Sequence, residues 1–221
     1  MGMPELGRTI RARRHKIKKT LVQIAEETGL TAGFLSQLER NQTSASISSL
    51  VVIAKALNIA VSDLVEQPAQ ALPDTYQGQR KPYSVINGQV RYERLSTVFP
   101  GSQIHSVKFT MPMGYKSETV SHEGDEMVFV LSGKVEYAVG MERYVLNVGD
   151  SLHFDANIPH SVEVLLHQNQ QAELIWMGTT KLFEEFVQIS TSKSRKSSSG
   201  GHQVFKGGTE FFNVDVKAVG V

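Results

Sequence analysis

LVQIAEETGLTAGFLSQLER, residues 21–40, predicts two short helices joined by a tight turn. Leu21 and Ile24 have the i, i+3 spacing of a helix with one apolar face. Gly29 is expected to end that helix, because glycine readily adopts the left-handed conformation found at helix ends. Thr31 then offers a side-chain cap for the start of a second helix.

The second helix is expected to have an apolar inner face and a short polar outer face. The residues expected on the outer face and at the helix start are Thr31, Ala32, Ser36, Gln37 and Arg40. Such a face fits the major groove of DNA, where glutamine and serine side chains bond to base edges. Helix–glycine–helix segments also occur in bundles that bind no nucleic acid, so a second feature is needed to decide.

The segment before these helices supplies that second feature. Residues 8–19 contain seven lysine and arginine side chains and no acid. A basic run is usually a solvated face, but beside a recognition helix it matches the footprint of a phosphate-binding surface. We expect Arg13 to contact backbone phosphate in this way.

Residues 6–64 resemble a helix-turn-helix domain of the lambda-repressor/Cro (XRE) family. The residues that carry the resemblance are LGRTIRARR, LVQIAEETGLTAGFLSQLERNQTSASISSLVVIAKALNI and VSDLV. It implies an N-terminal bundle of five short helices. It also implies that Gln23 binds phosphate, that the outer face of the second motif helix meets bases, and that Arg40, Asn41 and Gln42 approach the DNA backbone.

Length and composition limit the remaining possibilities. The chain has 221 residues, which fits two small domains better than one. It contains no cysteine, which excludes disulfides, thiolate metal sites and cysteine nucleophiles. It has neither a secretory signal pattern nor an apolar run near the roughly 18 residues of a membrane span. We therefore expect a cytoplasmic protein with no membrane partner.

The net charge of +1 hides an asymmetry between the two halves. Residues 1–67 hold nine Lys/Arg against six Asp/Glu, whereas residues 78–190 hold nine against thirteen. The basic half carries the helix-turn-helix, and the acidic half is poor DNA-binding surface. Because the basic excess is modest, tight binding to a double-stranded operator is expected to need a homodimer or higher homo-oligomer.

The expected domain organisation is a helix-turn-helix domain at 1–66, a linker at 67–83, a β-barrel domain at 84–190 and a Ser/Lys/Gly-rich extension at 191–221. Within the first domain, Ser46 or Ser48 is expected to cap an amphipathic helix over residues 47–57. Ser62 is expected to cap a last short helix. Near the end, helical spacing recurs over residues 182–187, and residues 204–221 alternate like an added strand or form a tail.

From Ser84 onward the apolar period changes to that of short strands separated by turns. The predicted strands are 91–95, 103–111, 127–131, 134–139, 142–146, 151–154, 161–165 and 173–177. Many short strands at regular spacing argue for an antiparallel barrel or a double-sheet jelly roll. The expected fold class is thus multidomain α + β, with the helical bundle followed by an all-β domain.

Residues 103–178 resemble a cupin, an all-β jelly-roll barrel with a central pocket. The constellation consists of Gly114, His122, Glu126 and Gly133, and of GDSLHFDANIPH at residues 149–160, which matches GDxxxFDxxxPH. In cupins this pattern usually supplies three histidines and one glutamate to a divalent metal. The resemblance maps His122, Glu126 and His160 onto three of those positions and places Val120 at the fourth.

Two interpretations of this pocket stay open. Two imidazoles and a carboxylate form a recognised triad for a divalent metal such as Fe, Mn, Ni or Zn. Alternatively, the same residues line a metal-free polar pocket for an organic effector. Tyr115, Glu118 and Trp176 are candidates for the pocket mouth, although aromatic residues in a barrel more often serve packing. His105, His153 and His167 are expected to be ordinary surface or core residues.

The sequence predicts a sequence-specific transcriptional regulator whose cupin domain senses a small-molecule effector and modulates operator binding, and not an enzyme. The alternative is a metal-dependent cupin enzyme, an oxygenase or epimerase, with an accessory helical domain. Val120 argues against that alternative, because most oxygenase-type cupin sites use the full ligand set.

Overall fold

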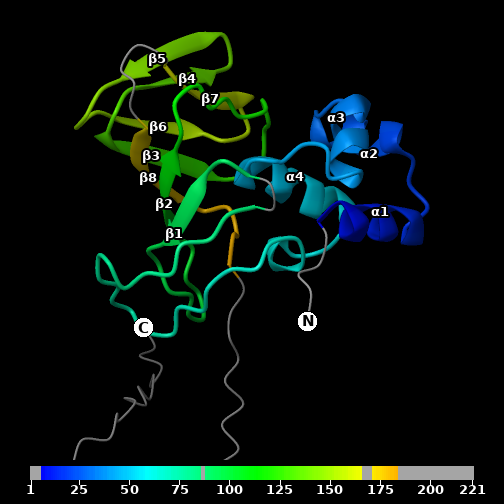
Figure 1. Ribbon diagram of the computed structural model, residues 1–221, viewed down its shortest axis with the longest axis horizontal. Helices are drawn as coiled ribbons and strands as arrows, with labels where there is room; N and C mark the ends of the chain where they lie inside the picture. The colour runs from blue at the N-terminus through cyan, green and yellow to red at the C-terminus, as the bar shows by residue number, and fades with distance from the viewer. Residues whose placement is uncertain (1–5, 86–87, 166–170, 184–221) are drawn as a thin grey trace, which may run out of the picture. The chain divides into compact units, whose positions relative to one another are not determined.

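The computed structural model describes residues 6–85, 88–165 and 171–183 (Figure 1). Its helices come first in the chain and form the blue-to-cyan group in Figure 1. They are α1 (Leu6–Lys16), α2 (Leu21–Thr28), α3 (Ala32–Glu39) and α4 (Ile47–Leu57), followed by the 3₁₀ turn η1 (Val61–Asp63). None of the described helices has the length and apolar character needed to cross a membrane.

The two motif helices and their turn are confirmed by their capping geometry. Thr20 and Gln23 form a capping box at the start of α2, each side chain accepting from the other residue's backbone N–H. Gly29 ends α2 with φ 71°, a left-handed conformation that suits glycine. The Thr31 hydroxyl accepts from the Phe34 N–H at 3.1 Å and caps α3 as expected.

Helix α4 is the core of the helical domain. Ser46 rather than Ser48 caps it, accepting from the Ser49 N–H at 3.0 Å, and Asn58 ends it with φ 52°. Leu50, Ile53 and Leu57 lie on α4 and are completely buried. Burial of such a leucine or isoleucine contributes about 1.5–3 kcal/mol.

The expected five-helix bundle is wrong in one respect. The described residues contain four α-helices, and the segment after α4 forms only the 3₁₀ turn η1. The expected cap Ser62 lies inside that turn, and the Asp63 carboxylate instead accepts from the Ala60 N–H at 3.1 Å. Val61 and Leu64 are both buried, and their i, i+3 spacing suits one 3₁₀ turn.

Eight described strands follow in two antiparallel sheets. The five-stranded sheet has the order β1-β2-β8-β3-β6, and the three-stranded sheet has the order β5-β4-β7. The strands are β1 (Arg91–Arg94), β2 (His105–Met111), β3 (Asp125–Ser132), β4 (Val135–Val139), β5 (Glu142–Leu146), β6 (Ser151–Asp155), β7 (His160–Val164) and β8 (Ala172–Gly178). These bounds lie within about two residues of the predicted ones for all eight strands.

The expected barrel is not closed, and the two sheets form a cupin-like sandwich. Between β2 and β3 the chain runs beside β7 through isolated bridges, Lys116 to Glu163 and Val120 to His160, instead of a continuous ladder. Closure of a barrel would require an unbroken ladder along that side. The core between the sheets is apolar, with Val128 and Leu174 completely buried.

Part of the basic run at residues 8–19 is used inside the helical domain, which the sequence did not reveal. Arg13 donates from Nε to Leu57 O at 2.9 Å and from Nη2 to Asn58 O at 2.8 Å, so it caps the end of α4. Lys19 donates to Ala56 O at 3.0 Å, at the same helix end. Unpaired carbonyls and the helix dipole attract cations there. The expectation that the whole run forms a phosphate footprint therefore needs correction.

Arg14 forms a buried ion pair with Glu39. Its Nε and Nη2 donate to the two carboxylate oxygens at 2.6 and 2.9 Å, and its Nη1 donates to Lys19 O at 3.0 Å. The two side chains are only 11% and 6% exposed. This pair joins α1 to the end of α3.

Expectations for the end of the chain fall mostly outside the described residues. Leu182 and Phe183 are buried but are not helical as far as they are described. The Arg94 guanidinium lies 4.0 Å from the centre of the Phe183 ring. Residues 184–221, which include the expected extension at 191–221, lie outside the described part.

We predict that Glu39→Gln destabilises the helical domain by about 3 kcal/mol, because it leaves the buried Arg14 guanidinium without its counter-charge. Urea unfolding followed by the helical circular dichroism signal measures this. Glu27→Gln is the matched control, since Glu27 pairs with Lys19 at 2.6 Å with its side chain 41% exposed. Such a pair contributes about 0–1 kcal/mol. Equal losses in the two variants would contradict the structural role of Arg14.

Candidate DNA interface and buried histidine–glutamate site

The outer face of α3 brings the predicted base-reading residues together. Thr31, Gln37 and Arg40 are exposed, while Ala32 and Ser36 are partly exposed on the same short helix. The Thr31 hydroxyl is already used as the α3 cap, so its methyl group and its backbone remain for contact with DNA. This arrangement fits insertion of α3 into a major groove.

The residues predicted to contact phosphate are placed less uniformly. Gln23 is exposed, and its Oε1 accepts from the Thr20 N–H at 2.8 Å, which leaves its amide nitrogen to donate. Asn41 has φ 55°, and its Oδ1 accepts from the Gly7 N–H at 3.0 Å, so it ties the loop after α3 to α1. Arg13 is used as the cap of α4. Gln23 and Arg40 are thus better placed to contact DNA phosphate than Arg13 and Asn41 are.

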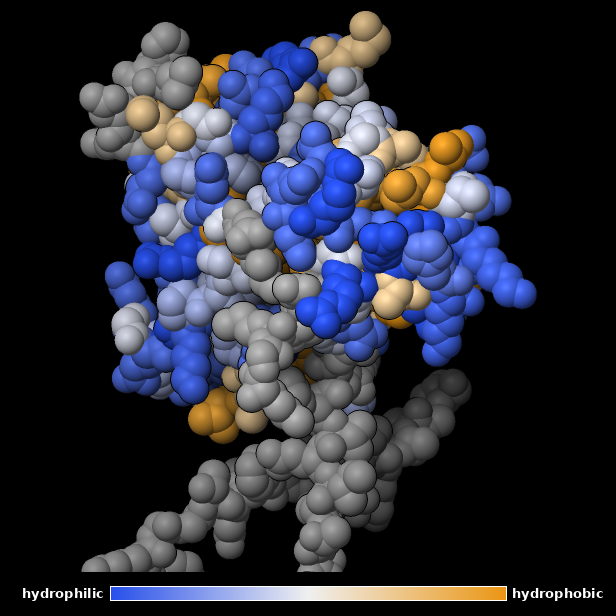
Figure 2. Space-filling view, turned by 45° about the vertical axis from the view of Figure 1, so that its right-hand side comes forward, coloured by the Kyte–Doolittle hydropathy of each residue, from blue (hydrophilic) through white to orange (hydrophobic). Residues whose placement is uncertain are grey.

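The surface seen in Figure 2 is mainly hydrophilic, with separate small apolar patches. Single exposed apolar residues are normal on a folded protein. A polar surface of this kind is compatible with a nucleic-acid partner.

The second candidate site is a buried cluster formed by His122, Glu126 and His160. Glu126 lies on β3, His160 begins β7, and His122 lies just before β3. The Glu126 Oε1 atom lies 3.0 Å from His122 Nε2 and 3.8 Å from His160 Nε2. The structure therefore brings together the three residues that the cupin resemblance selected, all of them buried.

Each imidazole is oriented by a hydrogen bond at its other nitrogen. His160 Nδ1 lies 2.9 Å from Ile158 O, which fixes its proton there. His122 Nδ1 lies 3.0 Å from the Thr180 hydroxyl, which itself donates to Glu123 O at 3.0 Å. Both rings then present Nε2 toward Glu126. Such outer partners orient metal-ligating histidines in general.

Burial lowers the pKa of His160 below its ordinary value, and the nearby Glu126 carboxylate opposes that effect. His160 is therefore neutral near pH 7, with a lone pair on Nε2. Among the described residues, neither that Nε2 nor Glu126 Oε1 has a hydrogen-bond partner, although His122 Nε2 approaches the carboxylate oxygen closely. Buried polar atoms without partners are costly.

A divalent cation would satisfy these atoms, so the cluster fits such a group. His122, Glu126 and His160 would hold it, and it would supply Lewis acidity and fixed positive charge. The fourth position of the cupin pattern is apolar here, because Val120 is buried and its backbone pairs with His160. Three protein ligands would leave other positions of the cation for water or a ligand.

The cluster opens on a cavity of about 30 Å³ between the sheets and α4. Tyr115, Glu118 and Trp176 line it, as the sequence suggested. Its other lining residues include Tyr92 and Tyr137, which sequence reasoning missed, and the start of α4 at Ser46, Ile47 and Ser48. Burial raises the pKa of Tyr137 above its ordinary range, so its phenol stays neutral. No sequence pattern could have shown that α4 borders the cavity.

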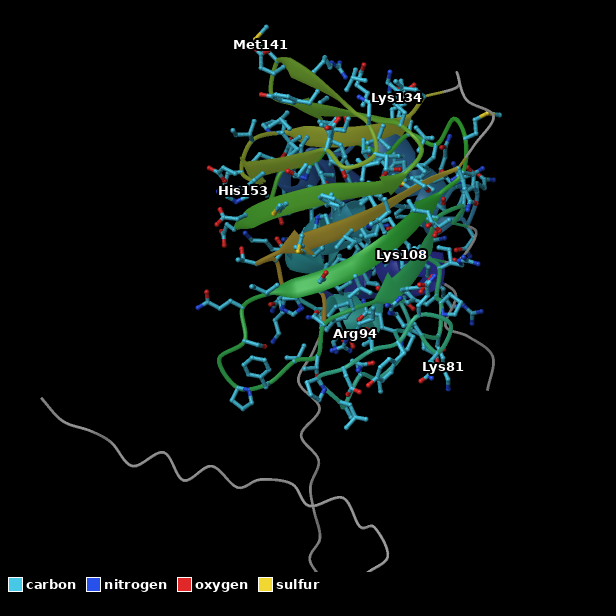
Figure 3. All side chains as sticks on the ribbon, turned by 90° about the vertical axis from the view of Figure 1, so that its left-hand side faces the viewer. Lys81, Arg94, Lys108, Lys134, Met141 and His153 are labelled. Carbon is cyan, nitrogen blue, oxygen red and sulfur yellow. The ribbon has the colours of Figure 1, made fainter. Side chains whose placement is uncertain are left out.

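The remaining histidines behave as expected where they are described. His105 is buried and its ring lies 5.5 Å from that of Phe183. His153 is exposed on β6, on the outer side of the five-stranded sheet, where Figure 3 labels it. His167 lies outside the described residues.

Comparison with known proteins gives two family matches and several relatives. The helix-turn-helix family model matches residues 10–64, and the cupin domain model matches residues 107–178. The HTH-type transcriptional regulator SutR of Escherichia coli (strain K12) is 30% identical over 157 residues, which cover 70% of this chain and 84% of SutR. The HTH-type transcriptional regulator PuuR of the same organism is 27% identical, over 62% of this chain and 75% of PuuR.

Among solved structures, an HTH_3 family transcriptional regulator from Vibrio cholerae has a similar fold. Its TM-score is 0.54 at 18% identity, with coverage of 80% of this chain and 96% of that chain. At this identity the likeness shows the fold alone.

We predict that the purified protein binds one Zn²⁺ or Mn²⁺ per chain and that His122→Ala weakens this binding at least about tenfold, because one of three ligands is lost. Isothermal titration calorimetry measures the affinity. His153→Ala is the matched control, since that histidine is exposed on the outer side of the sheet. Equal affinity in the His122 variant, or no binding by the unaltered chain, would favour the metal-free pocket.

Proposed function

This chain belongs to the HTH-type transcriptional regulators that carry a cupin domain, and we propose that its cupin pocket binds a small effector that changes operator affinity. The observation that carries the DNA-binding part is the exposed polar face of α3, a helix whose end is joined to α1 by the buried Arg14–Glu39 pair. The proposed readers are Thr31, Ala32, Ser36 and Gln37, with Gln23, Arg40, Asn41 and Arg13 closer to the backbone.

The proposed domain boundaries are 1–66, 67–83, 84–190 and 191–221. The first segment would bind DNA and the third would sense the effector. A protein that acts on chromosomal DNA in this way would work in the cytoplasm.

We propose that two copies bind one operator. A single α3 offers few base contacts, and several cations of residues 8–19 are used internally. Two copies would place their recognition helices in successive major grooves about 34 Å apart. Strand β5 is one candidate contact between copies, since it is a sheet edge with four of its five residues exposed, Tyr144 and Val145 among them. Exposed edges otherwise need protection.

The sensing part rests on the buried cluster at Glu126 and the cavity beside it. The cavity either holds a divalent cation on His122, Glu126 and His160, or admits an organic effector that bonds to the same atoms. In both cases an effector acts through its different affinity for two arrangements of the protein, typically a coupling of about 1–3 kcal/mol.

A metal-dependent oxygenase or epimerase is the second candidate, favoured by the His, His and carboxylate set with open positions. The sequence relatives SutR and PuuR are named as transcriptional regulators, which supports a non-enzymatic role. Stoichiometric iron together with a turnover that His122→Ala abolishes would favour the enzyme.

We predict that selection from a random duplex pool yields a consensus sequence for the full chain. Gln37→Ala should then weaken binding to the selected duplex by about 1–3 kcal/mol and relax the preference at one base pair, because one bidentate base contact is lost. Fluorescence anisotropy with the selected duplex and with single-base variants of it measures both effects. Selection that produces no consensus would contradict sequence-specific binding.

Arg40→Ala is the matched comparison, since Arg40 is exposed beside the same helix but is proposed to contact phosphate. It should weaken all duplexes alike and lower the slope of log affinity against log salt by about one. A loss confined to the selected duplex would assign Arg40 to base contact instead.

A further inference from the structure

The start of α4 is bonded to a side chain of the cupin domain. Glu118, in the segment between β2 and β3, accepts from the Ser46 N–H at 3.2 Å and from the Ser49 hydroxyl at 2.6 Å. Ser49 is completely buried, and Glu118 is partly buried. A carboxylate is favoured at a helix N-terminus, where free N–H groups and the helix dipole are positive.

These contacts form one continuous chain of hydrogen bonds. The Ser49 N–H donates to Ser46 Oγ at 3.0 Å, Ser46 Oγ donates to Ser49 Oγ at 2.8 Å, and Ser49 Oγ donates to Glu118. The Ser46 side chain that caps α4 is thus oriented in part by a residue of the other domain. Tyr92, a second cupin side chain, lines the same cavity as Ser46 and Ile47 at this helix end.

The segment that holds α4 also builds the pocket. Glu118 lines the cavity, Val120 pairs with His160, and His122 belongs to the buried cluster. Glu123, the next residue, pairs with Lys55 of α4 at 2.9 Å. That pair is well exposed and contributes little, so the main link is Glu118.

The cavity is small, so a ligand larger than a few atoms would have to displace part of its wall. About 30 Å³ has room for about two water molecules. A larger organic ligand needs a pocket of about 300 Å³ or more. The β-strand walls are joined to one another by ladders of hydrogen bonds, whereas the wall formed by Ser46–Ser48 is joined to the cupin domain by the hydrogen bonds to Glu118 and by the packing of buried Ile47. The start of α4 is therefore the wall through which a larger occupant would act on the helical domain.

Movement of α4 would reach the DNA-reading face by a short route. Only residues 40–46 separate α3 from α4. Asn41 in that loop is bonded to Gly7, and Glu39 at the end of α3 is bonded to Arg14. A shift at Ser46 would thus be carried to the end of the recognition helix.

We propose that the pocket is shared by both domains and that Glu118 transmits its occupancy to α4 and hence to α3. Glu118 acts as a positioning residue that touches both the ligand space and the helix start. The proposal rests on the proposed function, because it assigns the route by which that pocket regulates DNA binding.

The first test needs no ligand and no DNA. In the full chain, Glu118→Gln should raise amide hydrogen exchange of residues 47–50 at least about fivefold, because a charge-assisted bond to the helix start is lost. Glu163→Gln is the matched control, since Glu163 pairs with Lys116 at 3.0 Å on the sheet and does not touch α4. Unchanged exchange in the Glu118 variant would overturn the proposal.

A second variant distinguishes loss of the Glu118 bond from a general loss of stability. Ser49→Ala removes the hydroxyl that donates to Glu118 and keeps the carboxylate. The two changes should be strongly non-additive, so the double variant should exchange about as fast as the faster single variant. If the fold increase in exchange rate of the double variant equals the product of the two single-variant increases, the two residues act independently, which would contradict the proposal.

The second test measures transmission with Zn²⁺ as the probe, because His122, Glu126 and His160 form a ligand set for a divalent cation and the described lining of the cavity holds neither lysine nor arginine. Saturating Zn²⁺ should change the Kd of the unaltered chain for its selected duplex at least about fivefold. At a Zn²⁺ concentration that saturates the Glu118→Gln variant, as judged by calorimetry on that variant, its duplex Kd should change less than twofold on Zn²⁺ addition.

The outcomes distinguish failure of transmission through Glu118 from failure of sequence-specific DNA binding. Zn²⁺ that binds and leaves the duplex Kd of the unaltered chain unchanged overturns the proposed transmission while sequence-specific DNA binding stands. A chain that selects no consensus duplex loses the proposed function, and the exchange experiment then decides alone whether Glu118 holds α4. A chain that binds no Zn²⁺ loses the metal site, and the exchange experiment again decides.

Discussion

The N-terminus of α4 is the point on which the rest of the molecule depends. A helix start leaves backbone N–H groups unpaired. Here Ser46 accepts from the Ser49 N–H, and Glu118 of the cupin domain accepts from the Ser46 N–H and the Ser49 hydroxyl. The other end of α4 is capped by the cations Arg13 and Lys19. One buried helix is therefore held at both ends by charge, and one of the charges comes from the wall of the pocket.

The pocket contains buried polar atoms that lack hydrogen-bond partners. Glu126 and His160 present buried atoms without hydrogen-bond partners to a space that holds about two waters. Such a site favours an occupant that satisfies those atoms, and a larger occupant must displace part of the wall. Because α4 provides that wall, satisfying the site and moving the DNA-binding domain become linked events. This is how a sandwich fold with a small interior can act on a helix outside it.

Local signals were predictable from the sequence, and long-range side-chain pairing was not. Gly29 and Thr31 were assigned correctly, and Ser46 was one of two expected caps, because helix caps depend on residues within one turn. Strand bounds followed from alternation over a few residues. The cluster at His122 was found through the cupin resemblance. By contrast, the bonds from Arg14 to Glu39 and from Glu118 to Ser49 join distant positions, and charge patterns do not specify such partners. The basic run therefore appeared more available to DNA than it is.

Coupling between the recognition helix α3 and the pocket can be measured through Trp176. It is the single tryptophan of the chain, it is buried, and it lines the cavity. Coupling is reciprocal, so duplex binding at α3 must also alter the pocket. If α3 and the pocket are coupled, a saturating selected duplex should shift the fluorescence emission of Trp176, and a scrambled duplex of equal length should not. Unchanged emission when anisotropy shows the chain fully bound to the selected duplex would contradict the coupling.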